Sequence, residues 1–212
     1  MKTITTFLAL LFSTIIFAQS NNQLAVFGGV NYQPILKGNA IAGDLTARYY
    51  VGEKLSLGVG FDYTFKKYNQ GFGYLTDRTL MHNVTLNSIV QYDFLHSERL
   101  TVGAFVANGA SIVTLRDRNE TRTTETTQEI NGIWQTTIVE VPKRLGRDAF
   151  YILTPGIDFS YKVASLDEEF NVNLYITSRV GYQMAFGNGE FAKPKNFTDF
   201  VLMLGVTVKG DL

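Results

Sequence analysis

The sequence predicts an all-β fold: a closed, antiparallel, eight-stranded, up-and-down transmembrane β-barrel with a protruding extracellular hairpin. Three observations predict it. A short apolar leader opens the chain, eight segments alternate apolar and polar residues at period two, and the links between these segments alternate between short turns and longer polar loops. Period-two alternation indicates strands with two different faces, and alternating link lengths are typical of barrels that cross a bilayer.

The first 18 residues have the features of a secretory signal peptide. Lys2 gives a positive start, the stretch from Ile4 to Phe17 is mostly apolar, and Ala18 is a small residue at the expected cleavage point. The apolar run is about 14 residues, short of the roughly 20 that a spanning helix needs. We therefore expect residues 1–18 to be removed on export and residues 19–212 to form one barrel domain.

Composition limits the kinds of site that the chain can carry. It has no Cys, and its 19 Lys and Arg residues balance 19 Asp and Glu residues, with the charges scattered along the sequence. An exported chain without Cys has no disulfide framework and no lipidated Cys. Scattered, balanced charge gives no footprint for a polyanion, so nucleic acid is not an expected partner. With two His residues far apart and no Cys, we expect no metal and no cofactor.

Eight strands are expected from alternation and from enrichment in aromatic and β-branched residues. They lie approximately at 23–32, 41–51, 55–66, 80–94, 100–115, 149–163, 170–186 and 197–209. Most reach the 9–11 residues that a tilted strand needs to cross a bilayer, whereas strands of soluble domains average 5–6 residues. Length therefore favours a membrane.

The two faces separate most clearly in the strands at 55–66, 149–163 and 170–186. In the second of these, the odd positions are almost all apolar, while the even positions include Asp158 and Lys162. A soluble sandwich alternates in the same way but turns its apolar face inward, so alternation alone does not say which face lies inside.

The positions of the aromatic residues favour an apolar face that points outward. One group falls toward one rim: Tyr49, Tyr92, Phe94, Phe159, Tyr161 and Phe170. A second group falls toward the other: Tyr63, Phe65, Tyr151, Tyr182, Phe186 and Phe197. Two aromatic girdles on either side of Val, Leu, Ile and Ala are what a barrel presents to the two membrane interfaces. The alternative is a set of ordinary core aromatics in a soluble β protein.

The links supply a second test of the barrel. The odd links are long, at 33–40, 67–79, 116–148 and 187–196. The even links are short, at 52–54, 95–99 and 164–169. A barrel that starts in the periplasm alternates in this way, and an even number of strands leaves both termini on the periplasmic side.

With leader, amphipathic strands, girdles and loop asymmetry together, the chain resembles the small outer-membrane β-barrel proteins of Gram-negative bacteria, often labelled porin-like. The resemblance covers nearly the whole mature chain and rests on this pattern. It implies an integral protein of the cell outer membrane, in contact with membrane lipid and lipopolysaccharide and inserted by the barrel-assembly machinery. We expect a monomer.

The interior of such a barrel is just wide enough to be filled by side chains. The charged residues expected to face inward, as a polar network, are Asp44, Arg48, Asp62, Lys66, Asp93, Asp158, Lys162 and Arg179. Charges buried together must pair, because an isolated buried ion costs several kcal/mol. We expect a packed polar plug. The alternative, a gated path for ions or a site for a small solute, requires a continuous gap.

The link at 116–148 is expected to form a β-ribbon above the membrane. Two Thr-rich and β-branched arms, 123–130 and 133–141, flank Asn131-Gly132, a dipeptide suited to a type I′ hairpin turn. The ribbon carries Trp134, the single Trp of the chain. The aromatics expected to bind a partner at the surface are Trp134, Tyr68, Phe72, Tyr74 and Phe191. The alternatives are that Trp134 packs on neighbouring loops and that the loops cover the barrel mouth.

No catalytic residue is expected. Of the two histidines, His96 lies in the expected turn at 95–99, where adjacent side chains do not converge as a nucleophile, a base and an orienting group would, and His82 lies near the outer rim on the lipid side of its strand. We therefore predict a non-enzymatic, membrane-anchored scaffold for surface binding of an extracellular ligand, for adhesion or for envelope integrity. Two alternatives stay open: a narrow channel for ions or small solutes, and a soluble periplasmic barrel that binds a ligand.

Overall fold

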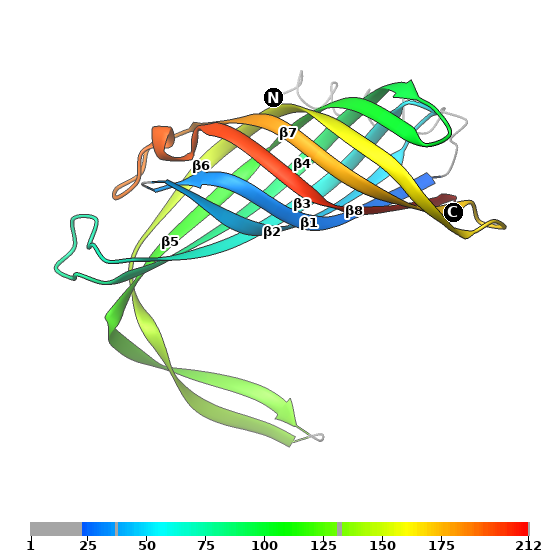
Figure 1. Cartoon of the computed structure of the whole chain (residues 1–212). Coiled ribbons are helices and arrows are strands. Elements are labelled where there is room, and N and C mark those ends of the chain that lie inside the picture. The colour runs from blue at the N-terminus through cyan, green and yellow to red at the C-terminus, as the bar shows by residue number, and fades with distance from the viewer. Residues whose placement is uncertain (1–22, 37, 131–132, 212) are drawn as a thin grey trace, which may run out of the picture.

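The computed structural model describes residues 23–36, 38–130 and 133–211, and these form a closed antiparallel barrel in which each strand pairs with the next and β1 pairs with β8 (Figure 1). The strands are β1 (Gln23–Ile35), β2 (Gly38–Tyr50), β3 (Leu55–Tyr68), β4 (Thr79–His96), β5 (Leu100–Ile130), β6 (Ile133–Asp167), β7 (Val172–Phe186) and β8 (Asp199–Asp211). The predicted leader lies outside the described residues. Within these residues, no helix has the length and apolar character required to cross a membrane.

The barrel is apolar outside and polar inside, as the sequence predicts. Val59 and Ile157 are 65% and 43% exposed, whereas Asp158 and Arg179 are 0% and 3% exposed. A water-soluble protein buries its apolar residues and exposes its charges, so this arrangement is the reverse of the soluble one. The fold class and the outward direction of the apolar faces are confirmed.

The predicted ribbon is also confirmed. The β5–β6 ladder runs to the pair Leu115↔Gly146, shifts register around Arg116, and resumes from Thr121↔Pro142 to Ile130↔Ile133. This second part extends beyond the barrel and bends away from it (Figure 1). The predicted type I′ turn at 131–132 lies outside the described residues.

The predicted long link at 33–40 is wrong. β1 continues to Ile35 and β2 begins at Gly38, and the two strands stay paired through Pro34↔Asn39 and Ile35↔Gly38. Proline within a strand is tolerated where one edge has no partner. Pro34 meets that condition, because the β1–β8 ladder ends at Tyr32.

The predicted start of the last strand is wrong as well. Residues Pro194–Phe197 form a short 3-10 helix, η1, and β8 begins only at Asp199. The side chain of Phe197 is 0% exposed, so it does not belong to the outer aromatic girdle. Phe200, which is 67% exposed, lies on the outer surface at the start of β8 instead.

Candidate functional site

The barrel interior divides into zones along its axis. We call the end at which β1 begins and β8 ends the terminus end, and the opposite end, which carries the 69–78 and 187–198 loops and the ribbon, the loop end. A polar network occupies the middle and the terminus half, an apolar cluster fills the loop end, and small cavities open at the terminus end.

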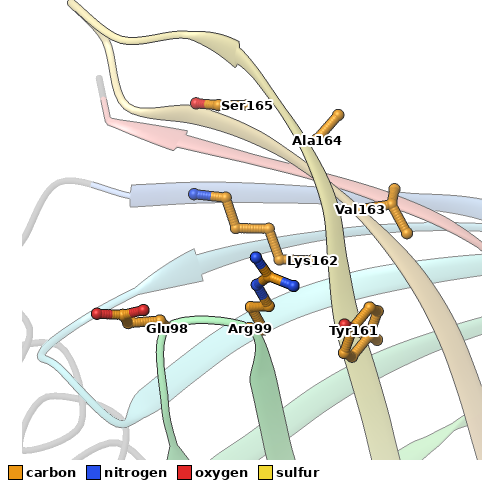
Figure 2. A pocket seen from close by; sticks show the side chains of 7 residues that line it. All are labelled: Glu98, Arg99, Tyr161, Lys162, Val163, Ala164 and Ser165. Atoms are coloured by element: carbon orange, nitrogen blue, oxygen red, sulfur yellow. The ribbon is translucent and has the colours of Figure 1, made fainter.

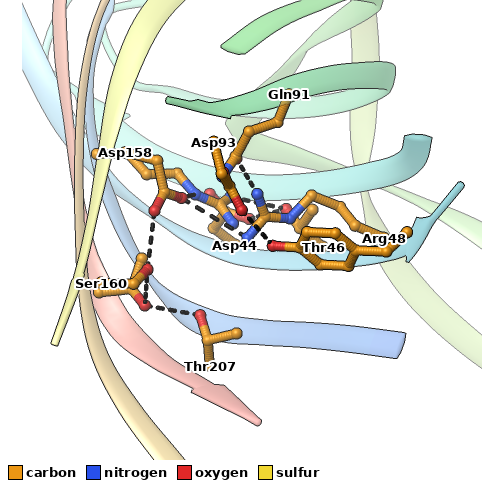
Figure 3. Close-up of polar contacts among 11 residues, drawn as sticks. Asp44, Thr46, Arg48, Gln91, Asp93, Asp158, Ser160 and Thr207 are labelled. Atoms are coloured by element: carbon orange, nitrogen blue, oxygen red, sulfur yellow. Dashed lines mark hydrogen bonds and ion pairs between the residues drawn. The ribbon is translucent and has the colours of Figure 1, made fainter. Parts of the chain in front are cut away.

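Asp158 of β6 is the centre of the polar network (Figure 3). Arg179 Nε donates a hydrogen bond to Asp158 Oδ2 at 2.7 Å, and Arg48 Nη2 lies 3.7 Å from the same oxygen. Ser160 Oγ donates to Asp158 Oδ1 at 2.8 Å. One buried carboxylate thus forms ion pairs with two buried guanidinium groups.

The network continues around the barrel wall toward the terminus end. Arg48 donates a hydrogen bond to Gln91, and Gln91 Nε2 in turn donates to Asp93 Oδ1 at 2.7 Å. The Tyr50 hydroxyl donates to Asp93 Oδ2 at 2.8 Å. From β6 toward β7, the hydroxyl of Thr177 is 3.0 Å from that of Ser160. These bonds join β2, β4, β6 and β7 across the lumen.

Asp44 and Asp62 are cross-strand neighbours in β2 and β3. Asp44 Oδ1 accepts a hydrogen bond from Thr46 Oγ1 at 3.1 Å, and Asp62 Oδ1 accepts one from Asn31 Nδ2 at 3.0 Å. In the described part of the chain, neither forms an ion pair within 4.0 Å, although both are buried. Hydroxyl and amide donors therefore satisfy these carboxyl groups.

Two lysines assigned to the network from the sequence lie near the barrel mouths instead. Lys66 Nζ donates to the Asn39 carbonyl at 2.8 Å near the loop end. Lys162 lines a cavity at the terminus end. The structure therefore brings Asp158, Arg179 and Arg48 together and separates both lysines from them.

A buried apolar cluster closes the loop end, and we call it the plug. Its members are Ile35, Leu36, Tyr68, Met81, Val113, Leu115, Phe150, Ile152, Ala185, Ala192 and Phe197. The Phe150 and Phe197 rings lie 5.1 Å apart between centroids. The alternation of the sequence does not predict this cluster, although Met81, Phe150 and Ile152 occupy inward positions of strands whose other inward residues are mostly polar.

Two loops fold over the plug. Asp148 of β6 accepts three backbone N–H bonds from the last loop, from Glu190 at 2.8 Å, Phe191 at 3.2 Å and Ala192 at 3.0 Å. Tyr74 of the 69–78 loop lies against Gly146, where an added Cβ would clash with its hydroxyl. Burial, together with the carboxylates of Glu190 and Asp148, raises the pKa of Tyr74 above its ordinary value. The phenol therefore stays neutral at the mouth.

Three of the aromatics predicted to bind at the surface, Phe72, Tyr74 and Phe191, lie in these two loops. Tyr68 is buried, and its hydroxyl donates to the Leu36 carbonyl at 2.6 Å. Phe72 meets the Tyr68 ring edge-on at 5.0 Å, and Phe72, Tyr74 and Phe191 all pack on the plug. The backbone of Trp134 pairs with that of Glu129 in the ribbon. The surface role of the Trp134 side chain stays a prediction.

Cavities at the terminus end narrow quickly toward the network. An open hollow lies at the rim beside the 97–99 turn and the end of β6, where Lys162 and Val163 point to opposite sides of the strand (Figure 2). A vestibule of about 170 Å³ lies between Lys162, Tyr175 and Lys209. Next to it, a cavity of about 10 Å³ reaches Arg48. This volume holds roughly one water molecule.

The two histidines have hydroxyl partners. His82 Nδ1 lies 2.8 Å from the Tyr63 hydroxyl on the outer surface, and His96 Nδ1 lies 3.2 Å from Thr101 Oγ1. Across the residues that the structure describes, no group of three His, Cys, Asp or Glu side chains has the geometry to hold a metal. Among the described residues, the hydrogen bonds of the two histidines are to these hydroxyl groups and not to a carboxylate.

A closed barrel of eight antiparallel strands with an apolar outer face and buried charged residues in its interior is an outer-membrane β-barrel. The chain is therefore a small integral protein of the outer membrane.

The chain is similar to several solved structures at low sequence identity. No family model matches the chain, and no curated protein matches it. Neisserial surface protein A is 13% identical, with 91% of this chain and 98% of that chain covered and a TM-score of 0.47. Ail of Yersinia pestis, in complex with a heparin analogue, is 10% identical, with 89% and 98% covered and a TM-score of 0.47. The N-terminal β-barrel domain of Pseudomonas aeruginosa OprF is 11% identical, with 90% and 99% covered and a TM-score of 0.47.

Proposed function

We propose that this protein is a non-enzymatic scaffold that holds the β5–β6 ribbon at the cell surface to bind an extracellular ligand. The observation that carries the proposal is the ribbon itself, which continues for ten paired positions, Thr121↔Pro142 to Ile130↔Ile133, beyond the shift in the barrel ladder. Neither ribbon strand pairs with another strand over this length in the described residues. Unpaired strand edges are templates for strand addition by a partner.

The ribbon is held firmly at its root. Thr76 Oγ1 donates to Asp117 Oδ1 at 2.9 Å, and Asn119 Nδ2 donates to Asp77 Oδ1 at 2.6 Å. Farther out, Ile138 is 67% exposed and Val139 is 40% exposed. An isolated two-stranded ribbon is marginally stable in water, so a fixed root and exposed apolar residues favour a role in contact with a partner.

The plug opposes the alternative of a channel. A path from the vestibule would have to pass Arg48, Asp158 and Arg179 and then cross the apolar cluster under the two loops. Ions do not cross a dry apolar constriction readily, because burying an unpaired charge costs several kcal/mol.

Removal of the ribbon tests the proposal. A variant that lacks residues 121–142 and closes the gap with a short Gly-Asn-Gly turn should still fold, because the deletion starts beyond the register shift. We expect cells that display the full chain to adhere to some of a panel of immobilised proteins and sulfated glycans, and cells with the deletion to lose that adhesion. Equal adhesion by both, with equal surface display, would refute the proposal.

Planar-bilayer recordings test the channel alternative. We expect no conductance steps above background for the full chain, because the plug blocks the lumen. The matched control is Phe197→Ala together with Phe150→Ala, which removes two rings from the plug. Stable steps from the unaltered protein would favour the channel over the scaffold.

A further inference from the structure

The vestibule at the terminus end carries two lysines and a tyrosine on three adjacent strands. Lys162 of β6 and Tyr175 of β7 are cross-strand partners, and Tyr175 pairs on its other side with Thr207 of β8. Lys209 follows Thr207 by two residues and so shares its inward face, and all three side chains line the vestibule of about 170 Å³. Lys162 points to the side of β6 opposite Val163, which is 46% exposed on the outer surface (Figure 2). The vestibule therefore faces the lumen and not the lipid.

Neither vestibule lysine has a carboxylate partner among the described residues. The ion pairs in this part of the chain are Arg48–Asp158, Arg179–Asp158 and Lys143–Glu120. Lys209 Nζ lies 3.8 Å from the centroid of the Tyr50 ring, a cation–π contact that holds the ammonium group at the mouth without neutralising it. Lys162 lacks even a contact of this kind. Two positive charges thus face the same small volume.

The carboxylates around the vestibule are bound to neutral donors instead. The two Asp93 oxygens accept hydrogen bonds from Gln91 and Tyr50, at 2.7 and 2.8 Å. The two Asp211 oxygens accept hydrogen bonds from amide side chains, at 2.7 and 3.4 Å. Glu98 lies at the edge of the vestibule in the exposed 97–99 turn. None of the three lies within 4.0 Å of either lysine, so the described chain leaves a place for an external anion.

A third cation lies beneath the vestibule. The inner cavity of about 10 Å³ shares Tyr175 and Lys209 with the vestibule and reaches Arg48. Arg48 is 2% exposed, and its Nε atom has no hydrogen-bond partner. Its Nη2 atom lies 3.7 Å from Asp158 Oδ2, the oxygen that already accepts a hydrogen bond from Arg179 at 2.7 Å. Cationic groups therefore follow one another from the mouth inward, and the innermost has an unused donor.

We propose that the vestibule is a binding site for a small tetrahedral oxyanion, such as inorganic phosphate, that enters from the terminus end. Lys162 and Lys209 supply the charge, the Tyr175 hydroxyl supplies a directed hydrogen bond, and a water molecule in the inner cavity links the anion to Arg48. The lumen position sets this anion apart from the head group of a lipid in the bilayer.

The size of the vestibule favours a small ion over a larger ligand. Its volume of about 170 Å³ is below the roughly 300 Å³ at which pockets for drug-sized ligands begin. A water molecule occupies roughly 30 Å³ of liquid, so one oxyanion and a few water molecules fill the space. The site lies at the end of the barrel opposite the ribbon, so it stands whether or not the ribbon binds a partner.

The test measures binding of inorganic phosphate to the full mature chain in octylglucoside micelles by isothermal titration calorimetry, at an ionic strength fixed with sodium chloride. We expect one phosphate per chain. Lys162→Gln with Lys209→Gln should weaken binding at least about tenfold, because both charges that face the anion are lost. Lys67→Gln with Lys195→Gln removes the same charge from exposed positions at the loop end and should leave binding unchanged.

Further arms separate a defined site from diffuse charge, from a lipid site and from a folding effect. Tyr175→Phe removes a donor but no charge and should weaken binding about tenfold. Lys162→Arg with Lys209→Arg keeps the charge and should keep most of the binding, and heat-modifiable gel mobility verifies that each variant is folded. Phosphatidylglycerol added to the micelles should not compete with phosphate. Equal affinity in the two charge-matched variants, no binding above that of chloride, or displacement by phosphatidylglycerol would overturn the proposal.

Discussion

At the scale of single residues, the side chains that fill the interior of this barrel are stabilised by specific neighbours. Phe27 is an apolar ring among polar neighbours, and it is 0% exposed. The guanidinium carbon of Arg179 lies 4.3 Å from its ring centroid, a cation–π contact. A Cβ at Gly29 or Gly205 would come within 2.7 Å or 2.9 Å of the ring, so the two glycines make room for it.

Asp158 gives the first prediction at this scale. Asp158→Ala leaves Arg48 and Arg179 buried, at 2% and 3% exposed, without the carboxylate that compensates them. Removing one partner of a buried ion pair costs about 3–5 kcal/mol. We expect that loss in the free energy of unfolding by urea in lipid vesicles. Glu53→Ala, in the exposed 51–54 turn, is the control and should change the free energy by less than about 0.5 kcal/mol.

A result within about 1 kcal/mol of the unaltered protein for Asp158→Ala would show that water or ions already compensate the two arginines. Asp158→Asn, which keeps the shape and one acceptor oxygen, should fall between the two. The order of the three proteins therefore separates the loss of charge from the loss of packing.

At the scale of elements, the 187–198 loop is held closed by one strand residue. The Asp148 carboxylate accepts hydrogen bonds from three backbone N–H groups of the loop. Each hydrogen bond to a charged group contributes about 1.5–3 kcal/mol to stability. Asp148→Ala should therefore open the loop and speed tryptic cleavage after Lys195 by at least about tenfold. Glu190→Ala alters an exposed side chain of the same loop and should leave the cleavage rate unchanged. Equal rates for the two variants would mean that packing on the plug, and not Asp148, holds the loop.

The strands could be predicted from the sequence, whereas the positions of the loops could not. Period-two alternation depends on neighbours two residues apart, and it is sufficient to orient Asp158 and Arg179 inward. The plug depends on where loops fold, and the sequence carries little local signal for that. Phe72 has φ of 51° and reaches the plug from a loop, and Phe197 reaches it from η1. The inward apolar residues Met81 and Phe150 are the one feature of the sequence that indicates the plug.

At the scale of the whole molecule, the sequence predicts which face meets lipid but not the depth of each residue. Leu174 is one of the apolar residues on the outward face, and it pairs with Val208 and Ala164 near the terminus end. Val180 lies farther along β7 and pairs with Ile157 and Leu202, in the middle of the barrel wall. The closed ladder, which relates each strand to both neighbours, is what sets this depth.

Depth gives the last prediction, because the cost of a charge on the lipid face falls from the midplane to the interface. Val180→Arg should lower the free energy of unfolding in lipid vesicles by about 2–4 kcal/mol, whereas Leu174→Arg should lower it by about 0–1 kcal/mol. The two substitutions lie on the same strand and the same face, so each controls for the other. Equal costs would contradict a membrane centred on the middle of β7. If neither substitution had a cost, the outward face would not lie in lipid at all.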